Sequence, residues 1–251
     1  MTQSDDNKTV VVTGATGGIG AAVCRRLARD GLQVVAVDRD PEPLDRLAGE
    51  LTGEGHIGRP VDLTNLAAHG ELLQEVEASG RRLVGLVHLA AVLRRRNSIF
   101  EVTEEDWDAQ IDTNLKATFF LNRAIAELLM RQAAGGSIVN FTSQGWWTGG
   151  FGGSVVYAAS KGGIVSMSRG LARTLAPHAI RVNTVAPGFV DTPMMRSGLT
   201  DAQLQASVDQ VPWGRMAEPE EVADPVSFLI GNDSRYMTGA TLNVTGGQLM
   251  Y

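Results

Sequence analysis

Tyr157 and Lys161 stand four residues apart in the segment YAASK. On a helix this spacing places the two side chains on one face. A phenol has a pKa of about 10 and is a poor base at neutral pH, but an ammonium group held nearby favours the phenolate. Such a pair can exchange a proton with an alcohol or a carbonyl. Ser143, at the end of an apolar run, adds a hydroxyl that can hydrogen-bond the same substrate oxygen.

A second chemical signal is the glycine-rich stretch TGATGGIG, residues 13–20, which follows an apolar run and opens a helical pattern. Glycines let the backbone turn tightly and let a pyrophosphate approach the helix N-terminus, where free N–H groups favour an anion. The stretch fits two spacings, one through Gly14, Gly18 and Gly20 and the other through Gly14, Gly17 and Gly20. The stretch alone does not decide between them.

Acidic residues follow the next two apolar runs. Asp38 ends the second run, where a carboxylate can accept hydrogen bonds from a ribose hydroxyl. Its charge would repel a 2′-phosphate, which favours NAD over NADP. Arg39 opposes this interpretation, because a guanidinium there could meet that phosphate. Asp62, which ends the third run, is a candidate for the adenine edge or for a cap on the next helix.

The elements that must position these residues alternate along the chain. Short apolar runs predict seven strands, at residues 8–13, 33–37, 56–61, 82–89, 136–143, 180–187 and 241–244. Helical patterns separate them, at residues 19–31, 43–51, 65–80, 104–132, 155–177, 201–208 and 219–230. This alternation predicts parallel crossovers and hence an α/β fold, a doubly wound parallel sheet of the Rossmann type with helices on both faces. We expect one domain over residues 1–251, with residues 1–7 flexible.

Composition limits the classes of function. The chain has 251 residues, 43% of them hydrophobic and 20% charged, and its net charge of −6 gives no reason to expect nucleic acid or an anionic membrane as a partner. No apolar run is long enough to span a membrane, and Met1 to Lys8 lack the apolar core of a signal peptide. The single cysteine, Cys24, and four scattered histidines indicate neither disulfides nor a metal site. We therefore expect a cytoplasmic, metal-free protein.

The order of the motifs adds a family resemblance. The glycine turn, Asp38, DTNL, NFTS, YAASK and RVNTVAPGFVDTP occur in the order seen in the short-chain dehydrogenase/reductase family, and the resemblance covers essentially the whole chain. It implies that Tyr157 is the acid/base and that Lys161 lowers its pKa and binds the nicotinamide ribose. It also implies that Ser143 positions the substrate oxygen and that Asn114 holds a water in a proton relay through Lys161.

The same resemblance, taken with the residues themselves, predicts the cofactor contacts. The expected contacts are Gly14, Thr16, Gly18, Ile19, Gly20, Asp38, Arg39, Asp62, Leu63, Ala90, Tyr157, Lys161, Pro187, Gly188, Val190 and Thr192. The expected cofactor is NAD, with NADP less favoured because of Asp38.

The family has two branches, which differ in the glycine turn. Its simpler branch uses the first glycine spacing, and its extended branch, mostly nucleotide-sugar enzymes, uses the second. HLAA, residues 88–91, resembles the extended branch, whereas the C-terminal segment from residue 214 resembles the simpler branch throughout. The chain after Tyr157 is too short for a separate sugar-nucleotide region. We therefore interpret the turn as Gly14, Gly18 and Gly20.

Apolar side chains near the expected site suggest the nature of the substrate. Trp146 and Trp147 follow Ser143 closely and predict an apolar or ring-stacking wall, or else packing against a neighbouring helix or subunit. The expected substrate lid, residues 190–215, adds the adaptable side chains of Met194 and Met195. We expect a largely apolar alcohol or ketone.

A run of basic residues leaves one question open. Arg94, Arg95 and Arg96 follow the fourth strand, near the expected entrance for substrate. Three arginines in a row form a solvated face in most proteins. If they bind an anion instead, they favour a carboxylated or phosphorylated substrate.

The sequence thus predicts an NAD-dependent oxidoreductase that interconverts a secondary alcohol and its ketone. The resemblance implies a homotetramer, with its interfaces on the helices at 104–132 and 154–176 and on the last strand. One alternative is an NADPH-dependent 3-oxoacyl reductase of the same family, which Asp38 disfavours. A dinucleotide-sensing protein without activity and a nucleotide-sugar epimerase are more distant alternatives.

Overall fold

All seven strands form one parallel sheet. The computed structural model describes residues 7–150 and 152–251, so residues 1–6 of the segment expected to be flexible lie outside it. The strands are β1 (Lys8–Thr13), β2 (Gln33–Asp38), β3 (Ile57–Pro60), β4 (Arg82–His88), β5 (Gly136–Phe141), β6 (Ile180–Pro187) and β7 (Thr241–Val244). Their order in the sheet is β3-β2-β1-β4-β5-β6-β7, and every pairing is parallel. The predicted Rossmann-type sheet is confirmed.

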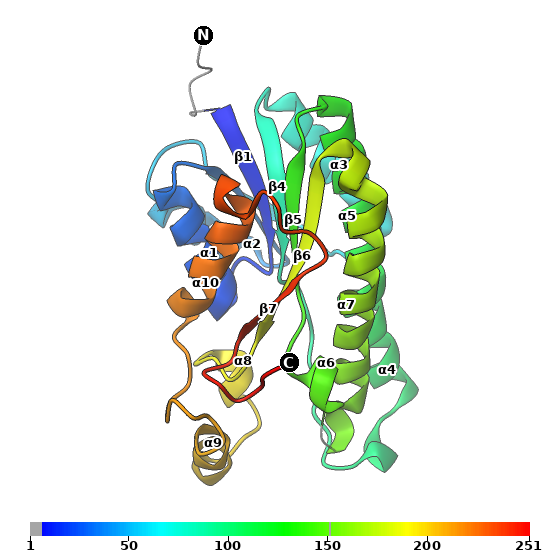
Figure 1. Ribbon diagram of the computed structural model, residues 1–251, viewed down its shortest axis with the longest axis vertical. Helices are drawn as coiled ribbons and strands as arrows, with labels where there is room; N and C mark the ends of the chain where they lie inside the picture. Colours follow the sequence, from blue (N-terminus) through cyan, green and yellow to red (C-terminus); the bar gives the residue numbers. More distant parts are fainter. Residues whose placement is uncertain (1–6, 151) are drawn as a thin grey trace.

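Helices cover both faces of this sheet (Figure 1). One face packs on α1 (Gly18–Arg29), α2 (Pro41–Glu50) and α10 (Pro219–Ile230), and the other on α3 (Leu66–Ala78), α5 (Ala117–Gln132) and α7 (Val155–Leu175). Side chains alternate along a strand, so Val10 and Val12 enter the first core and Val11 enters the second. Burial on both faces explains why the strands read as continuous apolar runs.

The carboxyl ends of the strands define one edge of the sheet, at the lower end of Figure 1. The chain leaves β1 towards β2 and β3 and then returns to β4 on the other side of β1. In sheets of this kind, ligands bind in the crevice where the strand order reverses, outside the carboxyl ends of the strands. Four short helical elements lie at this end of the molecule, namely α4 (Glu104–Ile111), α6 (Gly145–Thr148), α8 (Pro193–Arg196) and α9 (Asp201–Val208).

The structure interrupts one helix that the sequence predicted as continuous. Between α4 and α5 the backbone forms a π-helical segment, Asp112–Lys116. Asn114, fully buried, lies in its middle. Wide turns of this kind are rare and occur mostly at functional sites. The interruption therefore marks the position of one predicted site residue.

Candidate active site

Tyr157 and Lys161 lie on adjacent turns of α7, as their spacing predicts. The Lys161 Nζ lies 5.5 Å from the centre of the Tyr157 ring and donates a 2.9 Å hydrogen bond to the carbonyl oxygen of Phe141, at the end of β5. Burial lowers the pKa of Lys161 to about 7 and raises the pKa of Tyr157 to about 12. The positive charge of Arg95 opposes the shift at Tyr157. The phenol is therefore protonated in the ligand-free protein.

Ser143 is held beside α7 by the end of β5. Thr142 Oγ1 donates a 2.8 Å hydrogen bond to the Lys161 carbonyl oxygen, which ties strand to helix. The Ser143 Oγ accepts a 3.2 Å hydrogen bond from the Gly145 amide. A Cβ at Gly145 would lie 3.6 Å from Ser143 Oγ and 3.7 Å from the side chain of Ala158. These are ordinary contact distances, so the serine loop packs closely against α7 at the residue that follows Tyr157.

Asn114 anchors the loop that follows β4. Its Oδ1 accepts a 2.8 Å hydrogen bond from the Val92 amide, and its Nδ2 donates to the Val92 carbonyl and to Ser160 Oγ. The buried side chain therefore joins the β4 loop to α7, one residue before Lys161. The role of Asn114 in a water-mediated relay stays a prediction.

The glycine turn lies between β1 and the start of α1, without a side-chain cap on the helix. An added Cβ would lie 2.0 Å from the Gly14 carbonyl oxygen at position 20 and 2.8 Å from Thr192 Cγ2 at position 18, but 3.3 Å from its nearest neighbour at Gly17. Gly14 itself has φ of +65°, and a Cβ there would lie 2.8 Å from the Ala90 amide. These close approaches favour the spacing through Gly14, Gly18 and Gly20. They form a cradle of bare backbone at a helix N-terminus, which fits a pyrophosphate.

Asp38 faces this turn from the end of β2. Its carboxylate accepts hydrogen bonds from the Thr16 amide (3.0 Å), the Thr16 hydroxyl (2.6 Å) and the Arg39 amide (2.9 Å). The Arg39 side chain is exposed. Asp62 accepts from the amide and hydroxyl of Thr64, and these bonds, with the charge of Arg39, lower the pKa of Asp62. Asp38 is thus aimed at the nucleotide cradle, whereas one oxygen of Asp62 closes a local turn.

The other predicted cofactor residues lie at the start of α1 or follow strands at the same end of the sheet. Thr192 touches the glycine turn at Gly18, so the start of the lid closes one side of the cradle. The remaining positions follow β3, β4 and β6 or lie in α1, and they are Ile19, Leu63, Ala90, Pro187, Gly188 and Val190. Leu63 and Val190 are buried, which limits them to backbone contacts with a ligand.

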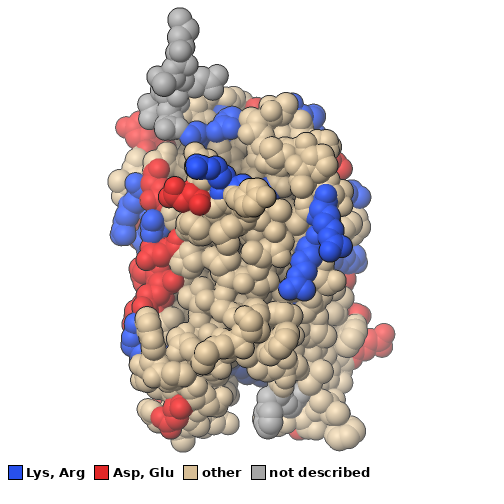
Figure 2. Space-filling view, in the orientation of Figure 1, with Lys and Arg blue, Asp and Glu red and all other residues tan. Residues whose placement is uncertain are grey.

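Trp146 and Trp147 pack against a residue that the sequence did not single out, Tyr251. The Tyr251 ring stacks on Trp147 at 5.2 Å and meets Trp146 edge-on at 5.0 Å. The Trp146 Nε1 also donates a 3.1 Å hydrogen bond to the Tyr251 hydroxyl. Trp147 and Met194 stay 56% and 46% exposed, so apolar surface is available at this end of the molecule. Figure 2 shows the molecule notched there, between the part that carries α8 and α9 and the part that carries α6.

The three consecutive arginines have different surroundings. Arg96 forms an ion pair with Asp106, and the side chain of Arg94 is exposed. Arg95, which is half-buried, donates from Nη1 to the carbonyl oxygens of Met194 (3.1 Å) and Ser197. The loop after β4 is therefore joined to the lid through Arg95, a contact for which the sequence carries no signal.

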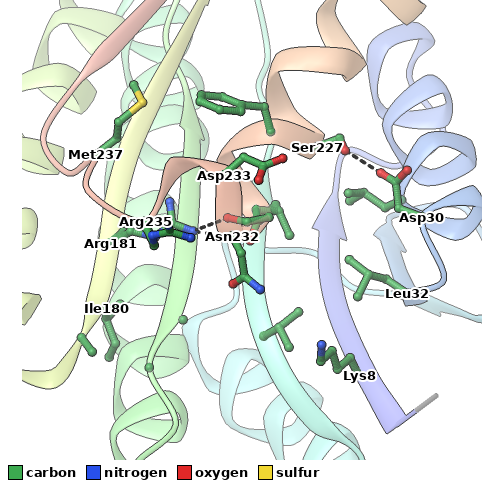
Figure 3. Close-up of a pocket in the computed structure, with 18 of the residues that line it drawn as sticks. Lys8, Asp30, Leu32, Ile180, Arg181, Ser227, Asn232, Asp233, Arg235 and Met237 are labelled. Atoms are coloured by element: carbon green, nitrogen blue, oxygen red, sulfur yellow. Dashed lines mark hydrogen bonds between the residues drawn. The ribbon is translucent and has the colours of Figure 1, made fainter. Parts of the chain in front are cut away.

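A groove with a volume of about 1090 Å³ lies at the opposite end of the sheet (Figure 3). It is lined by residues at the starts of β1, β4, β5 and β6 and by the end of α10. Arg181 within it donates to the carbonyl oxygens of Leu229 and Gly231 and to Ser234 Oγ. This arginine caps the end of α10, so its role is structural, and the catalytic residues lie elsewhere.

The described residues contain neither a metal-binding cluster nor a membrane-spanning helix. Within residues 7–150 and 152–251, no group of three or more His, Cys, Asp or Glu side chains is arranged to hold a metal ion. In the same ranges no helix has the length and apolar character needed to cross a membrane.

Comparison with known proteins agrees with this geometry. A family model described as enoyl-(acyl carrier protein) reductase matches residues 14–248. The chain is 37% identical over 249 residues to (3R)-3-hydroxyacyl-CoA dehydrogenase of Canis lupus familiaris, covering 96% of this chain and 95% of the relative. It is 35% identical over 245 residues to 3-oxoacyl-[acyl-carrier-protein] reductase of Escherichia coli strain K12, covering 98% of both. It is 34% identical over 248 residues to (2S)-[(R)-hydroxy(phenyl)methyl]succinyl-CoA dehydrogenase subunit BbsD of Thauera aromatica, again covering 98% of both.

These matches extend over nearly all of the chain and agree with the order of its motifs. They identify an NAD(P)-dependent oxidoreductase that acts on CH–OH groups. The chain belongs to the short-chain dehydrogenase/reductase family.

Proposed function

We propose that the protein is an NAD-dependent oxidoreductase that interconverts a secondary alcohol and its ketone at the 3-position of an acyl group. The observation that supports this proposal is that Tyr157, Lys161 and the serine loop are joined to one another at the end of β5, while the glycine turn that Asp38 faces follows β1 at the same end of the sheet. The three relatives suggest the acyl group, because the name of each describes a hydroxyacyl or oxoacyl thioester. The sequence predicted the alcohol and ketone, and it named a 3-oxoacyl group only in the alternative of an NADPH-dependent reductase.

Proton transfer falls to Tyr157. In the direction of reduction, the protonated phenol donates to the carbonyl oxygen, while the Ser143 hydroxyl hydrogen-bonds the same atom. In the direction of oxidation, the phenol must first lose its proton, and a pKa of about 12 opposes that loss. The positive charges of Arg95 and of protonated Lys161 favour the phenolate. A bound nicotinamide dinucleotide supplies the hydride donor or acceptor.

The choice of NAD rests on Asp38. Its carboxylate already holds Thr16 of the turn and presents negative charge where a 2′-phosphate would lie. The alternative, an NADPH-dependent 3-oxoacyl reductase, is favoured by the similarity to the bacterial acyl-carrier-protein reductase and by the exposed side chain of Arg39. A dinucleotide sensor without activity gains no support, because such a protein has no need of the buried Lys161 or of the serine beside it.

We further propose a single domain over the chain, a homotetramer and a cytoplasmic location. The α4–α5 region supports assembly, because it exposes Trp107, Phe119 and Met130 by 49%, 40% and 40%. Large apolar side chains gathered on a helix surface are typical of subunit contacts. Sedimentation measurements on the purified protein would test the tetramer.

Thermal shifts with NAD(H) and, separately, NADP(H) test the cofactor. A ligand at 100 times its dissociation constant stabilises by about 2.7 kcal/mol, which is a shift of several degrees for a protein of this size. We expect a shift with NAD(H) alone. Oxidation of a 3-hydroxyacyl thioester, followed by nicotinamide absorbance, then tests the reaction. A shift with NADP(H) alone would replace the proposal with the reductase alternative, and no shift with either would favour neither enzyme.

A further inference from the structure

Arg95 connects the loop after β4 to the segment around α8. It follows β4, and its Nη1 donates to the carbonyl oxygens of Met194 (3.1 Å) and Ser197, in and just after α8. Carbonyls in the last turn of a helix lack intrahelical partners, so they are natural acceptors for a cation. One side chain thus joins the β4 loop to the substrate lid.

Most N–H groups of the Arg95 guanidinium have no acceptor among residues 7–150 and 152–251. The group has five N–H donors in a plane. Both of its hydrogen bonds use Nη1, and within the described part of the chain neither Nε nor Nη2 has an acceptor. The neighbouring Arg96 uses this same Nε and Nη2 edge to hold both oxygens of Asp106. The free edge of Arg95 is the one that binds a carboxylate through two parallel hydrogen bonds.

The position of this free edge relates it to the reaction. Arg95 is half-buried, and burial lowers its pKa, while Tyr157 opposes that shift. The positive charge of Arg95 in turn opposes the rise in the pKa of Tyr157, so the two groups lie within electrostatic range of each other. No carboxylate among the described residues forms an ion pair with Arg95, so its charge is not neutralised within that part of the protein. A partly desolvated cation beside the proton donor is favourable only where an anion joins it.

We propose that Arg95 recognises a carboxylate of the substrate, carried on the acyl part within a few bonds of the reacting carbon. This inference rests on the proposed function, which it narrows to acidic 3-oxo and 3-hydroxy substrates. A phosphate could use the same donors, but the phosphates of a coenzyme A thioester are separated from the reacting carbon by the long pantetheine arm. The carboxylate takes the free edge of Arg95, while Nη1 keeps the lid in place.

Matched pairs of ketones test this recognition. One pair is acetoacetate and methyl acetoacetate, and the other is monomethyl 3-oxoadipate, with a free terminal carboxylate, and dimethyl 3-oxoadipate. Acetoacetyl-coenzyme A, which carries phosphates but no free carboxylate, tests whether Arg95 recognises phosphate instead. We expect kcat/KM for the carboxylate of at least one pair to exceed that of its ester by about 10-fold or more.

Substitutions then assign the preference to Arg95. Arg95→Gln lowers kcat/KM for the carboxylate by about 10- to 100-fold more than it lowers that of the ester, because the lid contact and the charge near Tyr157 are lost for both substrates alike. Arg95→Lys keeps the positive charge but loses the planar pair of N–H donors. Its ratio of kcat/KM for carboxylate over ester therefore lies between those of the wild type and Arg95→Gln. Arg94→Gln is the control, because it removes the same charge from an exposed neighbour, and it leaves the ratio unchanged. Melting temperatures confirm that each variant is folded.

Three results would overturn the inference. They are an equal loss for carboxylate and ester in Arg95→Gln, a wild-type preference for the esters, and an effect confined to acetoacetyl-coenzyme A. If no probe is turned over, calorimetric titration of the same pairs onto the protein with oxidised dinucleotide decides the question. If the wild type binds the carboxylate and Arg95→Gln does not, the inference about Arg95 is supported. The lack of turnover then counts only against the proposed reaction. Equal binding of carboxylate and ester, or no binding of either, would contradict the inference.

Discussion

Arg96 holds Asp106 through two hydrogen bonds, from Nε to Oδ2 at 2.7 Å and from Nη2 to Oδ1 at 3.0 Å. The same carboxylate accepts from the Thr103 amide and so completes the capping box that begins α4. Adjacent arginines therefore have opposite roles, since Arg96 stabilises the fold and Arg95 faces the substrate.

The substitution Arg96→Gln tests the structural half of this division. We expect it to lower the melting temperature by about 2 °C or more without altering substrate preference. Arg96 holds the pKa of Asp106 below its usual value of 3.8. The stabilisation is therefore present above that pH and is lost as pH falls through the folded pKa. Thermal melts at neutral and strongly acidic pH measure it, and a deficit that persists unchanged in acid would contradict this account.

Removal of the Tyr157 hydroxyl tests the acid/base assignment. Tyr157→Phe keeps the ring beside Lys161 but carries no proton, so turnover should fall by about 1000-fold. The thermal shift with dinucleotide should persist. Tyr236→Phe provides the control, since Tyr236 is fully exposed at the opposite end of the sheet. Activity in Tyr157→Phe equal to that of the wild type would refute the mechanism.

The buried Lys161 makes stability depend on pH. Its folded pKa of about 7 lies below its usual 10.5, so between these values the unfolded chain binds more protons than the folded one. The free energy of unfolding therefore rises with pH across this window, and the cost of burial is fully present below about pH 7. Lys161→Met removes that cost. We expect the variant to melt several degrees above the wild type near pH 7, with no advantage near pH 10.5. A gain independent of pH would be inconsistent with a buried ammonium.

Cofactor preference follows from the charge of Asp38. Asp38→Ala removes a hydrogen-bond acceptor for the ribose and the repulsion of a 2′-phosphate. We expect NAD to bind about 10-fold more weakly and NADP more tightly than to the wild type, as titration calorimetry would show. Asp40→Ala is the matched control, because Asp40 precedes α2 without a side-chain capping bond. An unchanged ratio of the two affinities would place the ribose elsewhere.

The fold was predictable because the strands are buried on both faces. Runs such as KTVVVT and IRVNTVAP are rich in β-branched and apolar residues. Their alternation with helical patterns leaves few possible topologies. The π-helical segment Asp112–Lys116 was not predictable, since its residues fit an ordinary helix and only tertiary contacts widen the turn. Helices of four residues, such as α6 and α8, are too short for any periodicity to appear.

The site residues, too, could be predicted only where a local sequence pattern marks them. Ser143, Tyr157 and Lys161 were singled out because their side-chain types and local spacing carry chemistry. The contacts of Arg95 with the lid join residues about 100 positions apart, and those of Tyr251 with Trp146 join residues 105 apart. No local pattern encodes such pairs. Among three consecutive arginines, only the folded structure distinguishes the one that holds a carboxylate from the one that lacks it.

The buried thiol of Cys24 is a natural probe for local opening of α1, the helix that follows the glycine turn. Cys24 lies in α1 with no exposed surface, and burial raises its pKa to about 12. Alkylating reagents attack the thiolate, so the closed fold resists them and labelling proceeds only through molecules in which α1 has opened. A dinucleotide seated on the N-terminus of α1 would slow that opening. The rate at which iodoacetamide modifies this one cysteine therefore reports, without any engineered probe, how often the cradle comes apart and how firmly a ligand holds it shut.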